Sequence, residues 1–302
     1  STRWIECSVL NALVQSGLSS SNGFVRKGTM AVLSIPRAIR RSLATAEEFT
    51  ASPPVLANSF PKNGTHLLQQ IVEGLPNRCN YGAFLASTTS SFQFRERSVD
   101  NTSRFIRSFV PGEIVRGHLY FDPHYVTELH SVHTVNFFIY RDLRDVVVSE
   151  AHYLRSMNRW HRLHPYFRDA ASIEDAIMLS ITGLNPTVRG IDYPNIAQRF
   201  ARYQGWLTCP DCLCIRYEDL QSDRREAEAR KMAKFYLERC NSPNLDVEKW
   251  VRDMLARVAP TRSHTFRTGK RGGWENEFTQ EHRRTFNEIA GNLIDELSVV
   301  CG

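Results

Sequence analysis

The sequence predicts an α/β fold, a single domain with a central parallel β-sheet flanked by helices. Short apolar runs typical of buried strands alternate along the chain with segments whose apolar residues recur at helical spacing. Parallel strands need helical crossovers of this kind, and the crossovers cover both faces of the sheet. Of the 302 residues, 42% are hydrophobic and 23% are charged. These proportions are typical of a globular domain with a sizeable core, and no repeat or linker divides the chain.

The predicted elements follow one another from residue 55 onward. Strands are expected at 55–60, 114–119, 135–140 and 212–217. Helices are expected at 66–75, 145–157, 173–182, 196–207, 224–240 and 280–297, the last with Thr279 as its N-cap. Segments 82–112 and 155–170 are interpreted as irregular and placed to line or cover an acceptor site. Ligands of parallel sheets bind beyond the carboxyl ends of the strands, so the loops after the four strands are the first candidates for a site.

Residues 1–50 are interpreted as an N-terminal extension that is partly disordered or peripheral, and residues 51–302 as the folded domain. The extension contains a stretch rich in Ser and Gly at 16–23. No signal peptide or membrane span is predicted, because the longest apolar runs are far too short to cross a bilayer. Seven cysteines, an odd number, indicate a reducing compartment, and the predicted location is cytoplasmic.

The net charge of +6 and the pI near 9.0 favour an anionic ligand. Nucleic acid is not the expected partner, because the basic residues form short scattered groups and no recognised nucleic-acid module is present. The spacing of Cys209 and Cys212 allows half a zinc site or a redox pair, but no second pair completes a zinc site. Histidine pairs at 130/133 and 161/164 also lack a grouped third ligand. No metal is expected.

The loop at 59–66 has the composition of a phosphate cradle. It joins a predicted strand to a helix N-terminus, where backbone N–H groups carry partial positive charge, and Lys62 adds a full charge. In nucleotide triphosphatases a Gly precedes the Lys, and a Ser or Thr follows it to hold magnesium. Here Lys62 precedes Gly64, and Asn63 stands where the magnesium-binding hydroxyl would be. The loop therefore predicts a phosphate ligand but not a magnesium nucleotide.

Two further segments carry anion-binding groups. Arg141 ends the third predicted strand and can make a bidentate phosphate contact, with Ser149 placed to donate its hydroxyl to the same group. A surface Arg–Asp network is the alternative interpretation. The late segment beginning Arg267-Thr268-Gly269 is basic and glycine-rich, and it could wrap an anion with backbone amides. Its alternative is a basic surface loop anchored by Trp274.

These three segments resemble those of the cytosolic-type sulfotransferases that use 3′-phosphoadenosine-5′-phosphosulfate (PAPS), and they follow one another along the chain in the same order as in that family. The resemblance covers roughly residues 54 to 297 and implies a P-loop-like sulfotransferase fold that releases 3′-phosphoadenosine-5′-phosphate (PAP) as product. His66 and Leu67 replace a threonine and a tryptophan of the family, and Leu143 and Thr268 replace a proline and a lysine, so the adenine site departs from the family pattern. The cofactor-binding residues that the resemblance implies are Lys62, Asn63, Gly64, Thr65, His66, Leu67, Arg141, Ser149, Tyr217, Arg267, Thr268 and Gly269.

The resemblance also implies the chemistry. His118, in a segment similar to the family's strand with a catalytic histidine, is expected to remove the acceptor's proton, and Lys62 to stabilise the departing phosphate. A histidine that merely packs at a strand end is the alternative for His118. The acceptor is expected to be a hydroxyl or amine of a small molecule, sugar or glycolipid. Two other functions remain open, a P-loop small-molecule kinase and a non-catalytic nucleotide-binding protein, and the sequence does not predict the oligomeric state.

Overall fold

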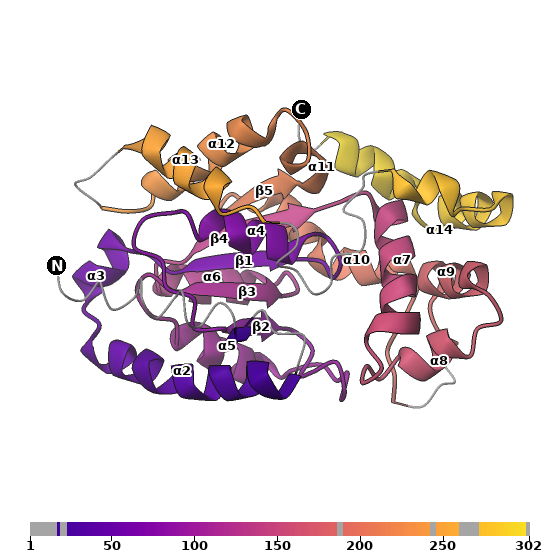
Figure 1. Cartoon of the computed structure of the whole chain (residues 1–302), viewed down its shortest axis with the longest axis horizontal. Coiled ribbons are helices and arrows are strands. Elements are labelled where there is room, and N and C mark those ends of the chain that lie inside the picture. The colour runs from indigo at the N-terminus through magenta and orange to yellow at the C-terminus, as the bar shows by residue number, and fades with distance from the viewer. Residues whose placement is uncertain (1–16, 19–22, 186–189, 242–245, 260–271, 300–302) are drawn as a thin grey trace.

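The computed structural model describes residues 17–18, 23–185, 190–241, 246–259 and 272–299. Its centre is a five-stranded parallel sheet with the strand order β2-β3-β1-β4-β5 (Figure 1). The strands are β1 (Val55–Ser59), β2 (Phe84–Ala86), β3 (Ile114–His118), β4 (Val135–Tyr140) and β5 (Cys212–Arg216). The predicted single α/β domain with a parallel sheet is thereby confirmed. All four predicted strands are present, three of them ending one residue earlier than predicted.

The fifth strand, β2, was not predicted, because three residues are too few for a periodic pattern to show. Segment 82–112 was interpreted as irregular, and this is wrong for β2 and for α5 (Val99–Arg107). Further helices also went unpredicted, among them α6 (Pro123–Ser131), α8 (His164–Arg168) and α13 (Val247–Ala256). Segment 155–170 was interpreted as irregular, and this is wrong for α8.

Helices cover both faces of the sheet, because successive strand residues point to opposite faces. Alternate β1 residues therefore enter different apolar clusters, Val55 on one side and Leu56 on the other. The side of Val55 is covered by α4 (Thr65–Val72), α12 (Arg225–Leu237) and α13, and the opposite side by α5 and α6 (Figure 1).

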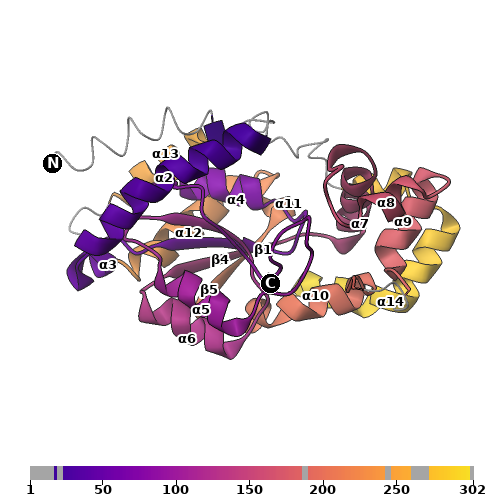
Figure 2. The same cartoon turned by 90° about the horizontal axis from the view of Figure 1, so that it is seen from below.

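A group of helices lies beyond the carboxyl ends of the strands. Figures 1 and 2 both show α7, α8, α9 and α14 together at this end of the molecule. Their bounds are Leu143–His152 for α7, Ile173–Thr182 for α9 and Gln280–Val299 for α14. The predicted helix 145–157 is instead α7 followed by the π-helix Tyr153–Met157, and 196–207 is α10 (Ile196–Gln204) followed by a 3-10 helix. The Thr279 hydroxyl accepts the His282 N–H at 3.2 Å, as a capping residue does.

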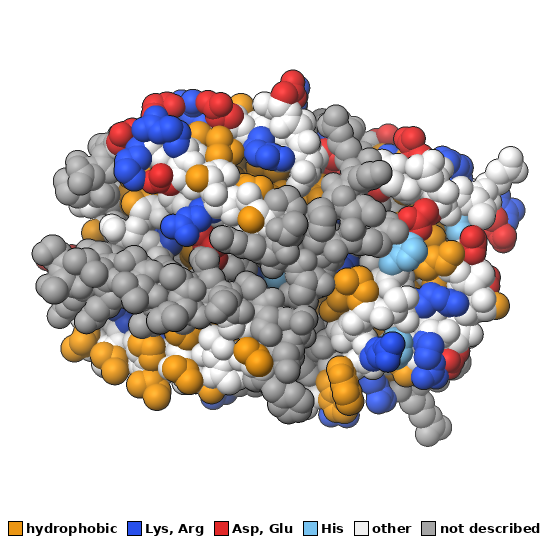
Figure 3. Space-filling model, in the orientation of Figure 1, with side chains coloured by type: hydrophobic (Ala, Val, Ile, Leu, Met, Phe, Trp, Pro, Cys, Tyr) orange, Lys and Arg blue, Asp and Glu red, His pale blue; other side chains and the backbone are white. Residues whose placement is uncertain are grey.

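Two helices precede the sheet, α2 (Gly23–Leu43) and α3 (Ala46–Ala51). Thr45 caps α3 with a reciprocal contact to Glu48, which satisfies two backbone donors at the helix start. The outer surface of α2 carries apolar side chains that Figure 3 shows along the lower edge of the molecule. These exposed residues are Val25, Val32, Ile35, Ile39 and Leu43.

A buried ion pair fastens α2 to the domain. The Arg37 guanidinium donates to both carboxylate oxygens of Glu113, at 2.6 and 3.1 Å, and the Glu113 side chain is fully buried. Burial raises the pKa of Glu113, although the Arg37 hydrogen bond and charge oppose that rise. Removing Arg37 would leave a carboxyl group in the interior without its charged partner.

We expect Arg37→Met to lower the free energy of unfolding by about 3 kcal/mol, because an uncompensated buried carboxylate is costly. Chemical denaturation at pH 7 would measure the loss. Arg40→Met is the matched control, since the Arg40–Glu48 pair of the same helix is partly exposed and contributes at most about 1 kcal/mol. Equal losses for the two variants would contradict the assignment.

Candidate functional site

The phosphate loop between β1 and α4 has a backbone bent in an uncommon way. Lys62 adopts a φ of 69° and Gly64 a φ of 100°, both in the left-handed region. The Asn63 N–H closes a turn onto the Phe60 carbonyl at 3.2 Å, and Gly64 is the N-cap of α4. A lysine with positive φ is uncommon and points to a functional constraint. The bend places Lys62 beside the α4 N-terminus, where partial positive charge favours an anion.

Besides the positive φ, the packing of Tyr217 also requires a glycine at position 64. A Cβ there would lie 2.5 Å from Cδ2 of Tyr217, closer than carbon atoms can approach. Tyr217 begins the short helix α11 (Tyr217–Leu220) directly after β5, so the phosphate loop and the loop after β5 are in contact. The two segments share one wall of the site.

If PAP, the ligand that the sequence resemblance implies, binds at this loop, Gly64→Ala should weaken its binding roughly ten-fold, because the left-handed backbone costs about 1–2 kcal/mol with a Cβ and the Tyr217 ring must move. Isothermal titration calorimetry would measure the affinity. Gly190→Ala is the matched control, since Gly190 also has a positive φ of 73° but a Cβ there would meet no atom within 4 Å. PAP affinity that is unchanged in Gly64→Ala would show that the loop does not cradle the ligand.

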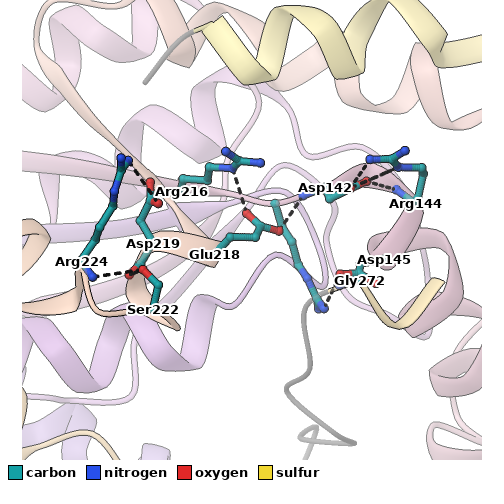
Figure 4. A network of polar contacts seen from close by, with 10 residues as sticks. Asp142, Arg144, Asp145, Arg216, Glu218, Asp219, Ser222, Arg224 and Gly272 are labelled. Atoms are coloured by element: carbon teal, nitrogen blue, oxygen red, sulfur yellow. Dashed lines mark hydrogen bonds and ion pairs between the residues drawn. The ribbon is translucent and has the colours of Figure 1, made fainter. Parts of the chain in front are cut away.

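Arg141 is buried at the carboxyl end of β4 and held from two sides. Its guanidinium pairs with Asp145 at 3.1 Å and lies 4.5 Å from the centre of the Tyr217 ring. Asp145 also accepts the N–H groups of Gly272 and Trp274, at 2.9 and 3.0 Å. The close-up in Figure 4 shows Asp145 beside Gly272. One buried carboxylate therefore joins the loop after β4 to the segment that follows the late basic stretch.

A second contact joins the loops after β4 and β5. The Asp142 N–H donates to Glu218 at 3.1 Å, and Arg216 pairs with the same carboxylate (Figure 4). The Arg144 guanidinium donates two hydrogen bonds to the Asp142 carboxylate and lies 4.0 Å from the centre of the Trp274 ring. Trp274 is thus a packed anchor for the late segment, as its alternative interpretation expected.

One cavity of about 800 Å³ unites the predicted residues at the carboxyl ends of the strands. Asn63 lies beside this cavity but does not line it, because its side chain is fully buried, and neither amide atom has a hydrogen-bond partner in the described part of the chain. Arg267, Thr268 and Gly269 lie outside the described residues. The predicted residues that line the cavity are Lys62, Gly64, Thr65, His66, Leu67, His118, Arg141, Ser149 and Tyr217.

His118 ends β3 and presents one ring nitrogen to the protein. Nδ1 lies 3.0 Å from the Ser59 carbonyl oxygen, which can only accept, so Nδ1 carries the proton and Nε2 is the basic nitrogen. Burial lowers the pKa of His118 to about 4, the Ser59 carbonyl opposes this, and the charges of Arg116 and Lys62 lower it further. The imidazole is therefore neutral and able to accept a proton at neutral pH.

The rest of the cavity wall includes residues of segments 82–112 and 155–170, which were expected to line or cover an acceptor site, and also residues that were not predicted from the sequence. It holds a buried cluster in which Glu150 accepts hydrogen bonds from Arg199, Tyr193 and Ser180 at 2.6 to 2.8 Å. Burial opposes ionisation of Glu150, but the Arg199 charge and these hydrogen bonds prevail and lower its pKa. No local motif marks these residues, because they come together only through helix packing. Further residues of this wall are Phe84, Phe94, Arg97, Tyr120, Tyr153, His161, Arg202 and Tyr203.

Within the described ranges, no three His, Cys, Asp or Glu side chains are grouped in a way that could hold a metal ion. The same part of the chain has no helix long and apolar enough to cross a membrane.

The family model of the sulfotransferase domain matches residues 52–298. The chain therefore belongs to the sulfotransferase family. A comparison with curated protein sequences gave no match.

Solved structures share the fold at low sequence identity. A mouse sulfotransferase, SULT7A1, complexed with PAP is 18% identical, with a TM-score of 0.51, over 84% of this chain and 87% of that one. Retinol dehydratase with androsterone and inactive cofactor PAP is 15% identical, with a TM-score of 0.52, over 86% and 84%. The complex of retinol dehydratase with retinol and PAP is 14% identical, with a TM-score of 0.51, over 86% of this chain and 85% of that one. At these identities the likeness shows the fold alone.

Proposed function

We propose that the protein is a PAPS-dependent sulfotransferase that moves the sulfuryl group to a hydroxyl or amine of a small-molecule, sugar or glycolipid acceptor. One observation carries the proposal. A single cavity brings together a phosphate loop, a buried arginine beside Tyr217, and a neutral histidine with a free basic nitrogen. The three groups match the needs of an anionic donor and a proton-bearing acceptor.

The residues present fit the nucleotide. Gly64 and Tyr217 line the cavity side by side, with the Tyr217 ring packed where a Cβ of residue 64 would lie, so the loop backbone and the ring both face a bound ligand. Amides at the start of α4 and the Lys62 ammonium would hold the 5′-phosphosulfate, while Arg141 and Ser149 would hold the 3′-phosphate. Tyr217, His66 and Leu67 would border the adenine, and we extend the site to Arg267, Thr268 and Gly269. Bound PAPS would supply the activated sulfuryl group.

Two residues would carry the chemistry. His118 Nε2 would take the acceptor's proton, because the Ser59 carbonyl fixes the opposite nitrogen as the donor. The Lys62 ammonium lies 4.1 Å from the centre of the Tyr153 ring, which orients it. From there it would stabilise the negative charge that builds on the departing phosphate.

The acceptor is proposed only as a class. Structures of retinol dehydratase contain androsterone and retinol, and the aromatic side chains in the cavity wall of this chain suit apolar acceptors of that kind. Arginines in the same wall suit the hydroxyl groups of a carbohydrate equally well. Cys209, Cys212 and Cys214 are free thiols, which supports a cytoplasmic reaction.

A small-molecule kinase is disfavoured because Asn63, at the magnesium-binding position of a nucleotide triphosphatase loop, is turned into the protein. Titration with PAP and separately with ATP–magnesium distinguishes the two functions. We expect PAP to bind and labelled sulfate to pass from PAPS to members of an acceptor panel. Binding of ATP–magnesium alone would overturn the proposal, and PAP binding without transfer to any acceptor would favour a non-catalytic nucleotide-binding protein.

A further inference from the structure

Ser59 links the phosphate loop to the proposed base through its side chain. It is the last residue of β1, and its hydroxyl lies 2.6 Å from the Thr65 hydroxyl at the start of α4. The same oxygen lies 3.2 Å from Nδ1 of His118 on the neighbouring strand β3. Ser59 therefore contacts two residues that line the cavity, one from each side of the proposed reaction.

The direction of these hydrogen bonds follows from the groups present. Nδ1 of His118 carries a proton, because the Ser59 carbonyl beside it can only accept. Facing that proton, the Ser59 hydroxyl oxygen acts as an acceptor, and its own proton is left for the Thr65 oxygen. The Thr65 proton then remains available to a ligand in the cavity. All three donors point the same way, from the histidine toward the phosphate loop.

Ser59 itself cannot touch a ligand. Its exposed fraction is 0%, and it is absent from the wall of the cavity to which Thr65 and His118 contribute. Any effect of this hydroxyl on binding or turnover must pass through its two neighbours.

We propose that Ser59 is a positioning residue that couples Thr65 to His118. Its hydroxyl orients the Thr65 proton toward the phosphate and presents an oxygen to Nδ1–H. Such a chain is polarised along its length, so it stabilises positive charge on the histidine and negative charge on the phosphate together. The inference rests on the proposed function, in which proton removal and phosphate departure create these two charges.

A double-mutant cycle on PAP affinity tests the coupling without any turnover. Calorimetry on the full chain would compare wild type, Ser59→Ala, Thr65→Val and the double variant. We expect Ser59→Ala to weaken PAP about five-fold when Thr65 is present and less than two-fold in the Thr65→Val background. Equal losses in both backgrounds, or no loss in either, would overturn the proposal.

Two further readouts separate coupling from a structural role. Ser59→Ala is expected to lower kcat about ten-fold with little change in the acceptor KM, and Ser59→Thr, which keeps the hydroxyl, to recover most of it. Ser52→Ala is the control, because Ser52 is a buried serine whose hydroxyl accepts from Arg78 away from the cavity. It should lower Tm and leave PAP affinity and kcat unchanged. A Ser59→Ala variant that changes only Tm would mean that the role is structural.

A measurement on the free protein distinguishes failure of this inference from failure of the proposed function. Nitrogen-15 NMR of His118 without ligand should show Nδ1 protonated and Nε2 bare. Protonation at Nε2 would reverse the hydrogen-bond direction and overturn the inference, whatever the protein binds. Absence of PAP binding by the wild type, with Nδ1 protonated, would instead count against the proposed function.

Discussion

Replacing His118 with alanine is expected to lower kcat/KM for the acceptor by about 10² to 10⁴-fold, the usual range for loss of a general base. PAP affinity should stay within about two-fold of wild type, because the proposed phosphate contacts come from other residues. Labelled-sulfate transfer and calorimetry would measure the two quantities on the same preparation. The expected result is a separation of turnover from cofactor binding.

The pH profile gives an independent check on the same residue. Because burial lowers the pKa of His118 to about 4, the basic form predominates above that pH in the free enzyme. Acceptor kcat/KM should therefore stay level from pH 8 down to about pH 5.5 and fall only in more acidic solution. His130→Ala, which removes an exposed histidine of α6, should leave both profile and rate unchanged. An acid limb centred at pH 6.5 or above would contradict the lowered pKa of His118.

Replacing Lys62 with methionine is expected to lower kcat by about 10² to 10³-fold, comparable to removing one preorganised charge-stabilising donor. The unbranched methionine keeps the contact with Tyr153 but carries no charge, so the fold of the loop should survive. PAPS affinity should fall less than kcat, since the negative charge on the departing phosphate grows as the reaction proceeds and is not yet developed in PAPS. Single-turnover kinetics with saturating PAPS would isolate the chemical step.

Lys231→Met provides the control for Lys62→Met. Lys231 is an exposed residue of α12 that does not line the cavity, and its loss should not alter the rate. Equal losses of kcat and PAPS affinity in Lys62→Met would assign Lys62 to ground-state binding instead of to the departing phosphate.

The fold and the family were predictable from the sequence because their signals are local. The apolar run of β4 is buried at every residue, and its predicted bounds are those observed. In the same way, Lys62 and Gly64 sit between a strand and a helix that the chain pattern shows directly. The short β2 escaped prediction, since its pairing with β3 and not its own sequence makes it a strand.

The Glu150 cluster of the cavity wall could not be predicted because distant segments form it. Glu150, Arg199 and Tyr193 lie on separate elements, and nothing in their spacing indicates a shared cluster. The contact of Asp145 with Arg141 was easier to predict from the sequence, since a carboxylate four residues after an arginine at a helix start favours an ion pair. The two backbone contacts of Asp145 to the late segment depend on tertiary structure alone.

The contacts of Asp145 with Gly272 and Trp274 form late during synthesis of the chain. Asp145 and Gly272 are 127 positions apart, and the ribosome delivers the N-terminal one first. Until Gly272 and Trp274 emerge, the buried Asp145 carboxylate lacks two of its three donors, although β1, β3 and β4 are already synthesised. The nascent chain therefore holds the loop between β1 and α4 well before the Asp145 carboxylate gains the N–H groups of Gly272 and Trp274.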